Sequence, residues 1–217
     1  LSRDLKIDIA VDLMGFTKNN RFGIFVERCA PIQVNYLGYS ATTGADCIDY
    51  IIGDKVVIPK ENQKDYSEKI IYLPDCFMVN DFKKKISTKI FTREELGLPK
   101  EGFVFCCFNK NYKITPNVFD CWMKILKKVK GSVLWLFENN PITIKNLQQE
   151  ANKRDVGSDR LIFAKPMVLD KHLARHKVAD LFLDTFPYTA HTTCSDALWA
   201  GLPVLTRTGE SFASRVS

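Results

Sequence analysis

The sequence predicts an α/β protein built on parallel β-sheets, and three observations support this fold class. Short apolar runs recur along the whole length of the 217 residues. They are rich in Val, Ile and Phe and lack strict alternation, as is typical of strands buried on both faces of a parallel sheet. In the second half of the chain, segments with helical periodicity separate these runs, so strand and helix alternate as in a doubly wound domain.

The strands are predicted from the apolar runs, taken in chain order. They lie at 7–13, 32–38, 50–54, 69–74, 103–108, 132–137, 160–165, 180–186 and 203–206. The last five belong to the part of the chain in which helices intervene, which is why the doubly wound pattern is assigned there.

The helices are predicted from apolar side chains on one face and from signals at their ends. Thr115 suits an N-cap and Pro116 the first helical position. Gly201 and Pro203 are common stop signals after a helix of about two turns. Helices are therefore expected at 115–129, 142–156, 169–179 and 192–200.

The domain organisation follows from where these elements lie. Residues 1–75 hold strands and few helical patterns, and we interpret them as the C-terminal part of a first domain. Residues 76–99 are polar and irregular, with room for a short helix at 92–97, and we interpret them as a linker. Residues 100–217 form the second domain. The chain lacks an initiator Met and stops inside a pattern, so we expect a fragment of a longer protein.

Composition narrows the function classes. The 31 basic and 25 acidic side chains give a net charge of +6. Because the lysines are scattered apart from short clusters such as 83–85, solvated surface is preferred over nucleic-acid binding. The seven cysteines form no C-x-x-C pair, so we expect no zinc site and reduced thiols in a cytoplasmic or nuclear protein. No apolar run is long enough to span a membrane.

Three loops leave the predicted C-terminal ends of strands, where parallel α/β sheets bind their ligands. If the sheet is parallel, the loops at 108–116, 164–172 and 187–193 share one rim. The cations, hydroxyls and imidazoles gathered there are Lys110, Tyr112, Lys113, His172, His191, Thr192 and Thr193. Helix N-termini at 115 and 192 add positive partial charge, so the rim suits an anionic ligand.

Each of these residues also has a simpler interpretation. Lys110 and Lys113 could be solvated lysines, and the two threonines could only cap a helix. His172 shares its helical segment with His176, which is typical of a surface face.

No P-loop, dinucleotide-binding glycine motif or nucleophile-elbow motif is present. The acidic residues near the rim are Asp170, Asp184 and Asp196.

Several long motifs, in order, resemble one known family. They are RCAPIQVNYLGYSATTG, DYIIGD, YSEKIIYLP, FNKNYKITP, RLIFAKP, DLFLDTFPYTAHTTCSDALWAGLPVLT and TGESFASRVS. Together they resemble the catalytic region of the O-linked N-acetylglucosamine transferase and Spindly family over nearly the whole chain. The resemblance implies the GT-B fold, in which two Rossmann-like domains bind a sugar nucleotide between them. This chain would hold the end of the first domain and most of the second, without the domain that animal enzymes insert near the linker.

The resemblance also implies roles at the donor diphosphate. His191, Thr192 and Thr193 match the family's H-T-T, which contacts the diphosphate at a helix N-terminus. Lys113 matches the lysine that stabilises the leaving diphosphate, and Tyr112 is its neighbour. Lys113 and His191 are accordingly the predicted catalytic residues.

Further matches concern the rest of the donor. His172 matches the histidine that stacks on the base, and Arg175 the arginine beside it. Asp196 matches the aspartate that holds the ribose. Leu37 and Gly38 match a Leu-Gly pair near the sugar.

Some positions depart from the family pattern. Lys110 stands where the animal enzymes have Gln, and Leu169 where they have a Lys near the ribose. Phe16 stands near a histidine of many bacterial relatives. Thr17 and Arg21 lie in the matching loop of the first domain, without an assigned role.

The implied reaction is the inverting transfer of N-acetylglucosamine from UDP to Ser or Thr hydroxyls of proteins, without a metal. Two alternatives stay open at this point. The donor could be GDP-fucose, as in Spindly, because the branches share H-T-T. The chain could also be a non-catalytic relative kept as a protein-binding module, an alternative that Leu169 leaves open while Lys113, His191 and Asp196 argue against it.

Overall fold

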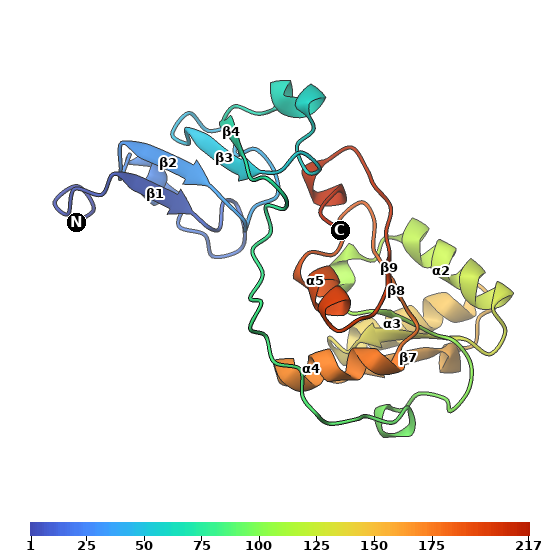
Figure 1. The fold of residues 1–217 in the computed structure, drawn as a ribbon. Coiled ribbons are helices and arrows are strands. Elements are labelled where there is room, and N and C mark those ends of the chain that lie inside the picture. The colour runs from blue at the N-terminus through green and yellow to red at the C-terminus, as the bar shows by residue number, and fades with distance from the viewer. The chain divides into compact units, whose positions relative to one another are not determined.

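Two units, each with its own parallel sheet, make up the computed structural model, which describes residues 1–217 (Figure 1). The first unit contains residues 1–80 and 210–216. The second contains residues 81–209 and Ser217. The predicted α/β class with parallel sheets is confirmed, and all nine predicted strands form, each shorter than its apolar run.

The first unit is a four-stranded sheet with the order β1-β2-β3-β4 and parallel pairing throughout. Its elements are β1 (Ile9–Asp12), α1 (Gly23–Val26), β2 (Ile32–Asn35), β3 (Tyr50–Gly53) and β4 (Lys69–Tyr72). Ile9 and Val11 on β1 are 55% and 44% exposed. The expectation that the strands are buried on both faces is therefore wrong for this edge strand, because no helix covers these side chains.

Residues 210–216 pack with the first unit, although the sequence pattern placed them with the second. The physical reason is a small apolar core. Phe212 lies edge-on to Phe77, with ring centroids 4.9 Å apart, and both rings are buried. Asn62 Nδ2 also donates a hydrogen bond to the Glu210 carbonyl at 3.1 Å.

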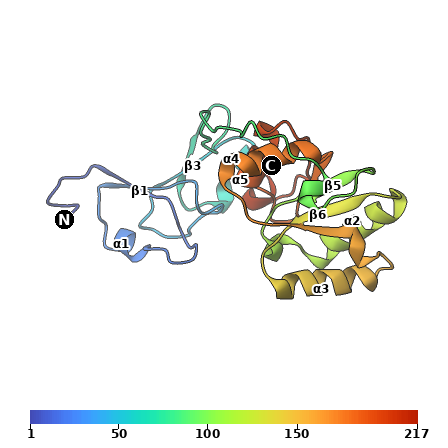
Figure 2. The same ribbon diagram turned by 90° about the horizontal axis from the view of Figure 1, so that it is seen from below.

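The second unit is a five-stranded parallel sheet with the order β7-β6-β5-β8-β9. Its strands are β5 (Val104–Cys107), β6 (Val133–Phe137), β7 (Leu161–Ala164), β8 (Leu181–Leu183) and β9 (Val204–Leu205). The helices α2 (Pro116–Lys128) and α3 (Pro141–Asn152) cover one face of the sheet, while α4 (Leu169–Arg175) and α5 (Thr192–Trp199) lie on the other (Figure 2). The strands β5 and β6 in the middle of this sheet are therefore buried on both faces, as their unbroken apolar runs predict.

The helices of the second unit begin where the sequence predicts, but some end early. They are α2 (Pro116–Lys128), α3 (Pro141–Asn152), α4 (Leu169–Arg175), which a 3₁₀ turn at His176–Val178 extends, and α5 (Thr192–Trp199). Thr115 is the N-cap of α2, and its side chain accepts from the Val118 N–H. The α3 helix ends before the predicted residue 156, because Asp155 adopts a left-handed conformation and Val156 N–H bonds back to the Ala151 carbonyl. With 13 residues, α2 is the longest helix, and none is long and apolar enough to cross a membrane.

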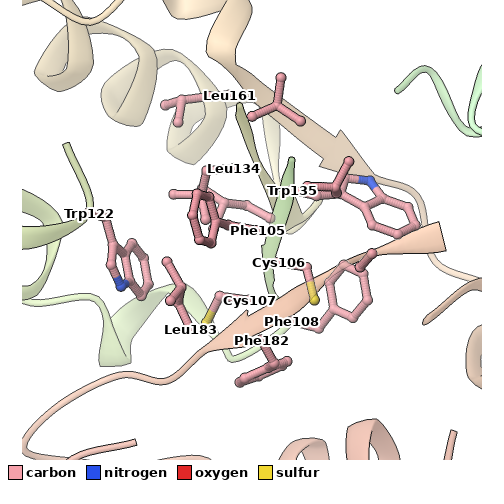
Figure 3. Packing of buried hydrophobic residues seen from close by; sticks show 14 of the residues in the cluster. Phe105, Cys106, Cys107, Phe108, Trp122, Leu134, Trp135, Leu161, Phe182 and Leu183 are labelled. Carbon is pink, nitrogen blue, oxygen red and sulfur yellow. The ribbon is translucent and has the colours of Figure 1, made fainter. Parts of the chain in front are cut away.

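The core of the second unit fills both sides of β5 (Figure 3). Cys106 points to the side of the sheet that holds Phe108 and Trp135, whose rings are 5.0 Å apart and edge-on. Cys107 points to the opposite side, with Leu183. Burial raises the pKa of the Cys107 thiol to about 12, so this cysteine packs as an uncharged apolar side chain.

Candidate functional site

The rim predicted from the sequence exists, because the strands that lead into its loops are parallel. β5 pairs with β6 and β8, and β6 pairs with β7, all in parallel. Their C-terminal ends therefore lie along one edge of the sheet, where ligands bind in folds of this kind. The loops at 108–116, 164–172 and 187–193 all leave from this edge.

Lys113 is a buried cation at this rim, not a solvated lysine. It ends a 3₁₀ turn, Asn111–Lys113, and is only 8% exposed. Its Nζ donates to the Thr189 carbonyl at 2.8 Å and lies 3.8 Å from the centroid of the Tyr188 ring. Burial lowers the pKa of Lys113 to about 8, against the opposing effect of Asp184. The ammonium is thus held in place by a neutral carbonyl and an aromatic ring, so its charge remains available to an anionic ligand.

Asp184 organises the loop that carries the Thr189 carbonyl, a role that the sequence did not reveal. Its Oδ1 accepts from Asn109 Nδ2 at 3.0 Å and from the backbone N–H groups of Thr185 and Ala190, each at 2.7 Å. Its Oδ2 accepts from the Thr206 hydroxyl at 2.7 Å. One carboxylate thereby ties together the ends of β5, β8 and β9. The available signal was an acidic residue directly after an apolar strand.

The α5 helix begins at Thr192 without a side-chain cap. His191 occupies the N-cap position, and its side chain forms no capping hydrogen bond. The interpretation of the threonines as caps is therefore wrong: the Thr193 hydroxyl donates instead to Asn109 Oδ1, and Thr192 is exposed. The first N–H groups of a helix have no partner within it and carry positive partial charge. This end of α5 can therefore receive an anion beside Lys113, since His191 and Lys113 both contact the Tyr188 ring.

His172 and Arg175 lie in a buried cluster on α4. The His172 ring lies 5.3 Å from Phe108 and 4.8 Å from His176. Burial, and then the Arg175 cation, lower the pKa of His172 to about 3, so its ring is neutral at neutral pH. His176 is only 1% exposed, so the expectation of a surface face carrying both histidines is wrong.

Arg175 packs against the aromatic rings of this cluster. Its guanidinium is fully buried, lies 4.7 Å from the Phe108 ring and donates from Nη1 to the Lys165 carbonyl at 2.5 Å. Its Nε and Nη2 have no hydrogen-bond partner. Such unpaired buried donors are costly in the free protein and favour an acceptor from a ligand or an ordered water.

Two predicted residues stay outside the buried part of the rim. Tyr112 is 69% exposed, and its ring centroid lies 6.2 Å from that of Tyr188. Lys110 is exposed, and its Nζ lies 5.6 Å from the centroid of the Phe137 ring. The remaining predicted residue of this unit, Asp196, lies on α5 one turn after Thr192 and pairs with Lys84 at 2.7 Å.

Leu37 and Gly38 belong to the first unit, directly after β2. Leu37 has a positive φ of 71°. A Cβ atom at position 38 would overlap the Leu13 carbonyl oxygen, so only glycine fits there. Thr17 and Arg21 lie in the loop after β1 in the same unit. The candidate residues are thus distributed over both units, with the charged and aromatic ones in the second.

The chemistry of the rim is that of an anion site. Its groups are a buried ammonium, hydroxyls, neutral imidazole and helix N-terminal N–H groups. Within residues 1–217, no three or more His, Cys, Asp or Glu side chains gather as metal ligands.

Two parallel α/β units, one of them with such a rim, define the GT-B class of glycosyltransferases. The model of glycosyl transferase family 41 matches residues 2–89 and 83–217, and the chain belongs to this family. The resemblance seen in the motifs is thereby confirmed.

Known proteins of this family are similar to the chain over nearly its whole length. The chain is 40% identical to the probable UDP-N-acetylglucosamine–peptide N-acetylglucosaminyltransferase SEC of Arabidopsis thaliana, over 98% of this chain and 22% of that protein. It is 33% identical to the probable UDP-N-acetylglucosamine–peptide N-acetylglucosaminyltransferase SPINDLY of the same plant, over 99% of this chain and 24% of that protein. It is 32% identical to a mutant Thermobaculum terrenum O-GlcNAc transferase, with a TM-score of 0.86 over 99% of this chain and 41% of that one. The chain thus spans about a quarter of the length of these curated relatives.

Proposed function

We propose that this chain carries the donor-binding part of a protein O-GlcNAc transferase, which moves N-acetylglucosamine from UDP-GlcNAc to Ser and Thr hydroxyls of proteins. The names of SEC, of SPINDLY and of the similar bacterial structure support the reaction. The partners would be the sugar nucleotide and protein acceptors.

The observation that carries the proposal is the environment of Lys113. In the reaction, the acceptor oxygen bonds to C1 of the sugar, the bond from C1 to the diphosphate oxygen breaks, and the hydroxyl proton is released. The diphosphate leaves with the bonding electron pair, so negative charge grows there in the transition state. An ammonium fixed by the Thr189 carbonyl and the Tyr188 ring needs no reorganisation to meet that charge.

The start of α5 supplies the second element of the proposal. His191, Thr192 and Thr193 would contact the diphosphate, with the helix N–H groups adding positive partial charge. The neutral ring of His172 would stack on the base, with Arg175 nearby against the Phe108 ring. Asp196 would accept hydrogen bonds from the ribose, and Leu37 and Gly38 would lie near the sugar.

No metal cofactor is needed in this proposal, because Lys113 and the N–H groups meet the diphosphate charge. Transfer that persists in excess EDTA would support it. The seven free cysteines support a reducing compartment, the cytoplasm or the nucleus.

The test is a thermal-shift comparison of UDP, GDP and their sugars on the full-length protein, with His172→Ala as control. A ligand at a hundred times its dissociation constant stabilises the folded state by about 2.7 kcal/mol. We expect a shift with UDP and UDP-GlcNAc that His172→Ala abolishes, followed by GlcNAc transfer to acceptor peptides.

Other results would redirect the assignment. A shift with GDP alone would move it to fucose transfer. A folded protein that responds to neither nucleotide would contradict donor binding and favour a non-catalytic role in protein contacts.

A further inference from the structure

The segment at 81–89 belongs to the second unit and forms hydrogen bonds with two of its helices. Ser87 N–H donates to the Asp170 carbonyl on α4 at 3.1 Å. On α5, Trp199 Nε1 donates to the Lys84 carbonyl at 3.2 Å, and Lys84 Nζ bonds Asp196 Oδ1 at 2.7 Å. The segment at 81–89 is therefore held against α4 and α5, the helices that carry part of the candidate site.

Lys84 differs from the two lysines beside it. Its side chain is 17% exposed and that of Asp196 is 13% exposed, whereas Lys83 and Lys85 are exposed. Ion pairs shielded from water in this way interact more strongly than surface pairs, and removal of one partner leaves an uncompensated charge. Of the three lysines at 83–85, Lys84 is thus the one that forms an ion pair.

The partner lies close to the proposed diphosphate site. Thr192 and Asp196 are four residues apart on α5, so they share one face of the helix, about 6 Å apart along its axis. An uncompensated carboxylate at that distance would repel a diphosphate. The Lys84 ammonium removes this repulsion, and its hydrogen bond goes to Oδ1, which leaves Oδ2 for another donor.

We propose that Lys84 is a positioning residue of the donor site, which neutralises Asp196 and orients its carboxylate so that Oδ2 can accept from a bound nucleotide. This inference rests on the proposed function, because the nucleotide is the donor of that reaction. It adds a residue from the segment before β5 to a site otherwise built from the loops after the strands and from the helices α4 and α5.

The test measures UDP and uridine binding by calorimetry, and the kinetics of GlcNAc transfer, on the full-length Lys84→Met protein. We expect the dissociation constant for UDP and the KM for UDP-GlcNAc to rise about tenfold while kcat stays within about twofold. Uridine, which lacks the diphosphate, should lose less affinity. Lys84→Arg should restore the wild-type values, and Lys83→Met and Lys85→Met are matched controls that should not differ from wild type.

A double-mutant cycle separates this role from a merely structural one. In an Asp196→Asn background no carboxylate remains to be neutralised, so Lys84→Met should cause no further loss of UDP affinity. Unchanged or tighter UDP binding by Lys84→Met would overturn the proposal, and tighter binding would mean that Lys84 competes with the donor. A wild-type protein that does not bind UDP would overturn the proposed function as well, which distinguishes the two failures.

Discussion

The two units use similar apolar strands but differ in what surrounds them. In the second unit, helices cover both faces of the sheet, and the candidate side chains include a buried lysine and a buried arginine. In the first unit, the edge strand β1 is partly exposed, and the candidate contribution is a tight backbone turn at Leu37 and Gly38. The candidate residues of the second unit are therefore charged side chains that their packing holds in fixed positions. Those of the first unit contribute a constrained backbone conformation.

The largest effect is expected from Lys113→Ala in the full-length protein. Removing one preorganised charge-stabilising donor often costs about 3–4 kcal/mol, or a hundredfold or more in rate. We expect transfer from UDP-GlcNAc to fall by at least that factor, measured as kcat. Circular dichroism and the melting temperature should show a folded protein. A near-wild-type rate would contradict the role of Lys113. The second unit would then not differ from the first by supplying a charge that acts in the reaction.

The next effect concerns the first unit and its backbone. Gly38→Ala places a Cβ atom against the Leu13 carbonyl oxygen, a backbone atom that cannot move aside cheaply. Overpacking of this kind typically costs about 1–3 kcal/mol. Hydrogen exchange should show lost protection in β1 and β2, with β5 unchanged.

Gly23→Ala is the matched control, since nothing lies within 4 Å of the position that its new methyl group would take and its φ is not positive. It should leave protection in both units unchanged. If Gly38→Ala also left β1 and β2 protected, the turn would not be constrained as the geometry indicates.

The third prediction concerns how kcat/KM for GlcNAc transfer depends on pH. The pKa of Lys113 is lowered from 10.5 to about 8, so the cation is lost as the pH rises through that value. We expect kcat/KM to fall about tenfold per pH unit above pH 8, because this parameter reports the free enzyme. The pKa of His172 is about 3, so its ring should add no acid limb between pH 5 and 7. Lys113→Arg should abolish the alkaline limb, and a profile flat to pH 10 in the wild type would refute the assignment.

Much of the fold could be predicted from the sequence because its signals are local. The apolar runs predict all nine strands, and Thr115 with Pro116 predicts the start of α2. Parallel pairing then follows from the alternation of strand and helix, which places three loops on one rim.

The parts that could not be predicted depend on contacts distant in sequence. Lys84 and Asp196 are 112 residues apart, so a cluster of three lysines gave no sign that one is paired. Likewise, the helical spacing of His172 and His176 fits a surface face or a buried one equally well. Only the packing of the Phe108 ring against His176 and Arg175 decides between them.

The smallest effect is expected from Lys110→Ala, three residues before Lys113 in the same loop. Lys110 is exposed, and its Nζ contacts only the face of the Phe137 ring at 5.6 Å. A solvated cation is screened by water and salt, so its contribution should stay below about 1 kcal/mol. We expect kcat to change by less than about threefold, which the same transfer assay measures, and any loss to shrink at higher ionic strength. Equal losses in Lys110→Ala and Lys113→Ala would mean that burial does not decide which cation of this loop acts on the diphosphate.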